Sequence, residues 1–250
     1  MAHSTTIFAL VLCASIIGCT LAVDVPDFIH VCKRNDPHIE DCIRRSVDEL
    51  KPKLVTGEPT YNIPSLEPLL LKELIATEGS GGLKITAREI KAYGASNFYI
   101  QKLRVDMNTL RFAMDILLPH LYIEGLYEIN GKVLLLPIRG SGPLTGNFTD
   151  ATGSVKIQAA TSKDINGDDH ITLNEFRMRI SIRKGSLNLE NLFNGDPTLG
   201  TVINNAINSN FDAFLKELQP LIEKALSNAF TDISNKIVNP FTYNQLFPAF

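Results

Sequence analysis

The sequence predicts an α+β fold in which a strongly curved antiparallel β-sheet wraps around a long C-terminal helix. Two patterns carry this prediction. In the last sixty residues, apolar residues recur at helical steps, whereas residues 59–189 consist of short β-like runs separated by turn residues. The composition fits a folded chain, because 44% of the 250 residues are apolar and 20% are charged.

The N-terminus has the features of a secretion signal. Residues 7–18 form an apolar run that is too short to span a bilayer, which needs roughly 20 residues, and a cleavage site follows at Ala22. We therefore expect a signal peptide over residues 1–22 and a secreted mature chain over 23–250, forming a single domain with no integral membrane span. The alternative is a bacterial lipobox that would make Cys19 the lipidated N-terminus of a periplasmic protein.

Cysteine usage fits the same oxidising route. Two cysteines fall in the predicted signal, which leaves Cys32 and Cys42 as a pair with nine residues between them. This spacing differs from that of zinc and redox motifs. We expect one disulfide that closes an N-terminal loop and contributes at most about 2–3 kcal/mol. The alternative is a pair of free buried thiols.

A glycosylation sequon begins at Asn147. The triplet Asn147-Phe148-Thr149 lies in a stretch rich in Gly, Pro and Thr, which predicts a surface turn. Because such triplets are common by chance, an unmodified asparagine is the alternative to a glycosylated one.

The first element of the mature chain is predicted to be an amphipathic helix over residues 36–51. Ile39, Ile43 and further apolar residues recur at three- and four-residue steps, with charged residues between them. Pro52 and Gly57 are expected to end this helix.

The middle region is predicted to form half-buried antiparallel strands. Residues 176–183 show this most clearly, because Phe, Met and two Ile alternate with three Arg and a Ser. Residues 83–87 and 155–159 repeat the pattern. Residues 121–138 are predicted to form a hairpin with a two-residue turn at Asn130-Gly131.

The C-terminal region predicts one long helix. Eleven apolar residues from Leu199 to Ile237 follow one another at steps of three or four residues. A continuous helix over residues 198–238 would be roughly 60 Å long, with a bend at Pro220. Since a helix of this length needs something to wrap around it, the pattern predicts one elongated domain.

Several segments of the mature chain form a recognisable series: the cysteines Cys32 and Cys42, then residues 63–69, 123–132, 134–142, 189–196 and 240–248. In their order and spacing, these segments resemble the takeout / juvenile-hormone-binding-protein family of insects, within the tubular lipid-binding superfamily.

The resemblance implies a secreted carrier with an internal apolar tunnel between the helix and the sheet. Its ligand would be a fatty acid, a terpenoid or a similar lipid, and its compartment an extracellular fluid such as haemolymph. Hormone-binding members have a second disulfide later in the chain. This sequence has no cysteine after Cys42, which implies the takeout branch and argues against juvenile hormone itself.

Such a carrier needs an apolar lining and a few polar groups that orient the ligand. For each candidate lining residue taken alone, ordinary core packing is the preferred interpretation, so only the set as a shared wall carries the hypothesis. Tyr127 is a candidate polar handle, with a purely structural hydrogen bond as the alternative. The candidate lining residues are Leu121, Ile123, Phe176, Met178, Ile203, Ile207, Phe211, Phe214 and Leu218.

A second hypothesis rests on residues 164–175, which match a calcium-binding EF-hand loop at most ligand positions. Position 6 of that loop, however, is Asp169 instead of Gly, and the flanking sequences alternate like strands. We therefore prefer an acidic turn between two strands, and keep a calcium-responsive binding module as the alternative function.

Other classes of function have weaker support. The formal net charge of −3 argues against nucleic-acid binding through phosphates. The sequence has no nucleophile elbow, no phosphate-binding loop and no pair of histidines at helical metal-ligand spacing. We expect a non-enzymatic carrier domain without metal or cofactor, acting as a monomer.

Overall fold

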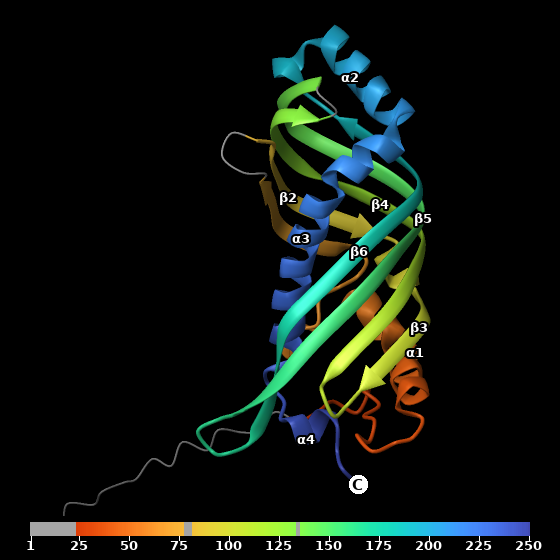
Figure 1. Cartoon of the computed structure of the whole chain (residues 1–250), viewed down its shortest axis with the longest axis vertical. Coiled ribbons are helices and arrows are strands. Elements are labelled where there is room, and N and C mark those ends of the chain that lie inside the picture. Colours follow the sequence, from red (N-terminus) through yellow and green to blue (C-terminus); the bar gives the residue numbers. More distant parts are fainter. Residues whose placement is uncertain (1–23, 78–81, 134–135) are drawn as a thin grey trace, which may run out of the picture.

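The computed structural model describes residues 24–77, 82–133 and 136–250. In this part of the chain, six strands form one antiparallel sheet, which curls along the helix α3 in an elongated molecule (Figure 1). The predicted signal peptide lies outside the described residues. The strands are β1 (Leu69–Thr77), β2 (Lys84–Tyr93), β3 (Tyr99–Asp106), β4 (Arg111–Val133), β5 (Leu136–Lys163) and β6 (Asp169–Leu189). The helices are α1 (Ile39–Thr56), α2 (Pro197–Ser209), α3 (Phe211–Val238) and α4 (Tyr243–Leu246).

The predicted α+β architecture is confirmed. The strand order is β1-β2-β4-β5-β6, and β3 pairs with the first part of β4 while β2 pairs with its second part. The three long strands β4, β5 and β6 form a meander that runs along most of the molecule (Figure 1). Near the middle of β5, Phe148 and Ala151 are both buried, and Asp150 between them has a φ of 53°. The inward alternation therefore slips by one residue where the sheet bends.

The helices α2 and α3 lie along the free edge of β6, where their polar side chains take the place of a further strand. Backbone groups of β6 are bonded at both ends of this edge and in between, so the edge cannot template pairing with another chain. The pairs are Asn204 with Leu189, Asn208 with Leu187, Gln219 and Glu223 with Ile180, Ser227 with Met178, and Asn235 with Leu173.

The prediction of one continuous helix over residues 198–238 is wrong at one position. The helices α2 and α3 meet at Asn210, whose φ of −125° and ψ of 35° are not helical. The backbone N–H and the side-chain amide of Asn210 donate to the carbonyl of Ala206, which closes the last turn of α2. Pro220, where we expected the bend, lies inside α3 without ending it.

The predicted hairpin is confirmed, but its turn is elsewhere. Asn130 and Gly131 lie within β4, opposite Arg139 and Ile138, and the last pair before the reversal is Val133 with residue 136. Gly131 has a φ of 149°, and a Cβ there would lie 2.7 Å from the Cα of Leu83. The glycine therefore allows the backbone of Leu83, just before β2, to approach β4 closely, and it does not form the turn.

Two further local predictions need correction. The helix predicted over residues 36–51 extends to Thr56, because Pro52 costs it one hydrogen bond without ending it, and Gly57 with a φ of 74° ends it as expected. The sequon at Asn147 lies within β5 and not in a surface turn, although its side chain is exposed on the outer face. The predicted disulfide between Cys32 and Cys42 is present.

Candidate functional site

Among the described residues, the interior between the sheet and the helices contains two separate buried clusters. The larger one, here called the main core, joins β1, β2, β4, β5 and β6 to the helices α2 and α3. The smaller one, here called the distal core, lies at the far end of β5 and β6. The main core consists of Leu69, Leu71, Leu83, Ile90, Ala92, Tyr127, Ile129, Val133, Ile138, Leu144, Leu189, Leu192, Ile207, Phe214 and Leu218. The distal core consists of Leu110, Ala159, Ile171 and Leu173.

Between these clusters, three rows of paired residues cross β4, β5 and β6. Directly paired residues of antiparallel strands lie on the same face of a sheet, and the buried members of the rows identify that face as the inner one. At two residues per step along each strand, the three rows span about 13 Å. The three apolar rows are Met114–Val155–Met178, Ile116–Gly153–Ile180 and Leu118–Ala151–Ile182.

The three apolar rows share one pattern of side-chain size and burial. Their middle positions on β5 carry small, buried residues, namely Ala151, Gly153 and Val155. The larger side chains on β4 and β6 are only half-buried and belong to neither of the two clusters described above. A strip of small residues flanked by larger, incompletely covered apolar side chains is a surface that gains from covering by an apolar molecule.

A small cavity lies at the other end of the interior, beneath α2. Its volume is about 50 Å³, and its wall is almost entirely apolar. Val133 and Ile138 line it from the β4–β5 hairpin, Ile203 and Ile207 from α2, and Phe214 from α3. This cavity separates the junction of the two helices from the hairpin.

The structure distributes the predicted lining residues over four places in the interior. Phe176 packs against the distal core and stacks on the ring of Phe230 with centroids 5.8 Å apart, and Met178 belongs to the apolar rows. Phe211 is buried with its ring against Phe148, with centroids 6.1 Å apart. The remaining ones form or contact the main core: Leu121, Ile123, Ile203, Ile207, Phe214 and Leu218.

Tyr127 is bonded within the protein. Its hydroxyl donates to the carbonyl of Glu190 at 2.6 Å, and its ring is part of the main core. Burial, with a smaller effect of Glu190, raises the pKa of Tyr127 to about 12. The hydroxyl therefore links β4 to the end of β6 and has a partner already.

Sequence reasoning missed the β4 side of the apolar rows. Met114, Ile116 and Leu118 alternate with Asp115 and Leu117, and the polar residue Asp115 is the only strong sign of the outer face. The alternation of residues 176–182 on β6 was clearer, because arginines mark its outer face.

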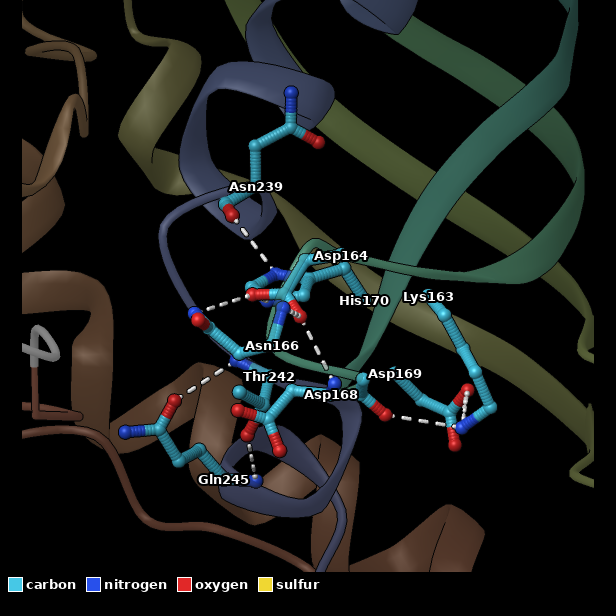
Figure 2. Close-up of polar contacts among 10 residues, drawn as sticks. Lys163, Asp164, Asn166, Asp168, Asp169, His170, Asn239, Thr242 and Gln245 are labelled. Carbon is cyan, nitrogen blue, oxygen red and sulfur yellow. Dashed lines mark hydrogen bonds and ion pairs between the residues drawn. The ribbon is translucent and has the colours of Figure 1, made fainter.

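The loop that resembles an EF-hand is the turn between β5 and β6, as the preferred interpretation predicted (Figure 2). The carboxylate of Asp164 accepts the N–H groups of Asn166 and Asp168, each at 2.9 Å. These bonds, the one from Asp168 first, hold the pKa of Asp164 below its usual value. The other oxygen of Asp164 faces His170 at 3.7 Å. Within the described residues, no group of three or more His, Cys, Asp or Glu side chains is placed to hold a metal ion.

A curled antiparallel sheet that closes along a long helix, with apolar side chains turned toward that helix, is the class of fold to which this chain belongs. The crystal structure of Takeout 1 from Epiphyas postvittana has this fold, with a TM-score of 0.72 and 20% identity, covering 88% of this chain and 99% of that one. The family model described as Haemolymph juvenile hormone binding protein matches residues 7–248. The chain belongs to this family.

The relatives are similar over nearly their whole length. The circadian clock-controlled protein daywake of Drosophila melanogaster is 25% identical over 231 residues, which cover 89% of this chain and 88% of that protein. Daywake of Drosophila yakuba is 23% identical over 233 residues, with 90% and 88% covered. Among the described residues, no helix is long and apolar enough to cross a membrane.

Proposed function

We propose that this protein is a secreted, non-catalytic carrier that holds a small hydrophobic ligand, such as a fatty acid or a terpenoid, between its sheet and α3. The observation that carries the proposal is the set of three apolar rows. The side chains of these rows on β4 and β6 are apolar, point toward the interior and are only half-buried. Family membership supports the same ligand class, because the family is described by its binding of a lipid hormone.

Apolar burial alone can supply the affinity of such a carrier. Covering about 300–400 Å² of a lipid yields about 8–10 kcal/mol at 25 cal/mol per Å², before the costs of association are subtracted. The ligand would lie along the strip formed by Ala151, Gly153 and Val155, flanked by the larger side chains of β4 and β6. The predicted lining residues on α2 and α3 would face it or support that wall from the main core.

The proposal includes the compartment and the covalent state of the chain. Residues 1–22 would be removed on secretion, and the oxidised pair Cys32–Cys42 agrees with an extracellular protein. Asn147 and Thr149 are both exposed on the outer face of β5, so a glycan on Asn147 would point away from the interior. The carrier would act as a monomer.

Titration with a fluorescent fatty-acid analogue tests the carrier function. Ile180→Trp places a large ring among the apolar rows, and we expect it to weaken binding of the probe at least tenfold. Ser181→Trp, the matched control one residue along the same strand, points outward and should leave affinity within twofold. The chain has no native tryptophan, so each introduced indole also reports its own surroundings by fluorescence.

The smaller change Met178→Phe provides a second test if Ile180→Trp unfolds the protein, and circular dichroism checks the fold of each variant. A wild-type protein that binds neither fatty-acid nor terpenoid probes would overturn the carrier proposal. Equal losses of affinity in the Ile180 and Ser181 variants would overturn the placement of the ligand.

A further inference from the structure

The two ends of the interior are closed in very different ways. At the end where α3 finishes, Phe241 is only 1% exposed and stacks on Tyr61, with ring centroids 6.1 Å apart. The N–H of Arg34 donates to the carbonyl of Pro248 at 2.9 Å, and the guanidinium of Arg34 lies over the ring of Tyr243. The disulfide of Cys32 fixes the segment that contributes Arg34. The N-terminal and C-terminal segments therefore close this end together.

The opposite end is closed by α2, which packs on the main core through Ile207 and is hydrogen-bonded to the sheet by two asparagines. The side chain of Asn204 accepts from the N–H of Leu189 and donates to its carbonyl, both at 2.9 Å. Asn208 bonds Leu187 in the same way, both at 2.8 Å. Among the described residues, these four bonds are the only side-chain hydrogen bonds between α2 and the strands.

The helical path is interrupted where α2 ends. Asn210 leaves the helical conformation, whereas the next residue, Phe211, is anchored by its ring against Phe148. Phe214 is likewise buried at 5% exposure in the main core. The start of α3 is thus fixed, and rotation about the backbone of Asn210 would move α2 with little change in α3.

The surface of α2 is apolar on both sides. Ile203 and Ile207 line the cavity beneath it, while Leu199 and Val202 are 46% and 57% exposed. The cavity of about 50 Å³ is too small for a lipid chain as it stands, so a chain that enters here must displace α2. An opened α2 would offer that chain apolar contacts on the way in.

We propose that α2 is a lid that opens about Asn210 and admits an apolar chain to the interior, while the other end stays closed. The asparagines Asn204 and Asn208 are its latch. This proposal rests on the proposed carrier function, because it names the route to the same binding region.

Stopped-flow mixing with a fluorescent fatty-acid analogue tests the lid. Asn204→Ala and Asn208→Ala each remove two latch bonds, so both should raise the rates of uptake and release at least fivefold, with the dissociation constant changed less than twofold. Asn235→Ala is the matched control, because Asn235 makes the same pair of bonds to Leu173 near the closed end. Its rates should stay within twofold of the wild type.

Hydrogen exchange provides a readout that needs no ligand. In the wild-type protein, amides of residues 201–209 should exchange at least tenfold faster than those of 223–235, and the two latch variants should widen this difference. Equal acceleration of uptake by all three variants, no acceleration by the latch variants, or equal exchange in α2 and α3 would overturn the lid. A wild-type protein that ignores the probe but shows fast exchange in α2 would overturn the carrier function and leave the lid motion supported.

Discussion

The charged carboxylate of Glu67 holds the connection between β2 and β3 in place. Its carboxylate accepts the hydroxyl of Ser96 at 2.6 Å and the N–H groups of Gly94 and Ser96 at 2.9 and 3.0 Å, between β2 and β3. Burial raises the pKa of Glu67, but these three hydrogen bonds outweigh burial and leave the pKa below its ordinary value of 4.5.

Because the folded-state pKa of Glu67 is depressed, its contribution to stability is present above about pH 4.5 and is lost as the pH falls through the folded-state value. We predict that Glu67→Gln is less stable than the wild type at pH 7 and that the difference shrinks toward pH 3. Urea unfolding at a series of pH values measures this. A difference that stays constant over the whole range would contradict the assigned role.

Tyr127→Phe separates the structural role of this hydroxyl from a role in ligand binding. Loss of the bond to the carbonyl of Glu190 should cost about 1 kcal/mol of unfolding free energy, with lipid affinity unchanged. The raised pKa also predicts that the contribution of Tyr127 to stability is full below pH 10 and lost as the pH rises toward 12. Tyr99→Phe, at an exposed ring, is the control. A large loss of affinity in Tyr127→Phe alone would instead make Tyr127 a ligand contact.

At the scale of single residues, the sequence predicts which side chains face inward better than what they do there. The alternation at residues 176–182 identified Met178 correctly as an inward residue of β6. In contrast, Gly131 looked like a turn residue, and only the close approach of Leu83, the residue before β2, explains it. Contacts between residues far apart in the chain leave no local pattern.

Among the elements, the contact between β6 and the start of α3 shows how the sheet fits its helix. A Cβ at Gly185 would overlap the ring of Phe211 and come within 2.9 Å of Phe148. We predict that Gly185→Ala destabilises the protein by about 1–3 kcal/mol, because the Phe211 ring has to move out of a packed site. Thermal unfolding measures the loss.

Gly200 in α2 is the matched control, since a Cβ there would meet nothing within 4 Å. Gly200→Ala should stabilise α2 by about 0.5–1 kcal/mol through its helix propensity. Destabilisation by both alanines to the same extent would contradict the packing account of Gly185.

The sequence pattern predicts that the helices and strands exist, but it does not predict where the helix breaks or how the helices attach to the sheet. The apolar period defined the C-terminal helical region but continued straight through Asn210, since the side chains on both sides of the break still face the sheet. The break comes from a side-chain amide that bonds its own helix, which competes locally with helix continuation. The bonds from α2 and α3 to the edge of β6 join residues 15 to 62 positions apart, which no local period reveals.

In the part of the chain that the structure describes, the molecule combines one long antiparallel sheet, a helix along its edge and an interior with two buried clusters separated by the apolar rows. The disulfide lies at the closed end of the molecule, where it joins the N-terminal segment to α1. We predict that replacing both Cys32 and Cys42 by Ser lowers the unfolding free energy by about 2–3 kcal/mol. Denaturant unfolding tests this, and an unchanged midpoint would show that the loop is held by its other contacts.

We propose above that an apolar ligand lies on the inner face of β4, β5 and β6. Photo-crosslinking with a diazirine fatty acid, followed by peptide mass spectrometry, tests it most directly on the intact protein. We predict one adduct per chain, suppressed by an excess of unlabelled fatty acid, with every adduct on the sheet confined to residues 112–118, 151–155 and 176–182 and any other adduct on the side of α2 or α3 that faces the sheet. Adducts spread over outward-facing residues, or labelling that unlabelled fatty acid does not suppress, would contradict it.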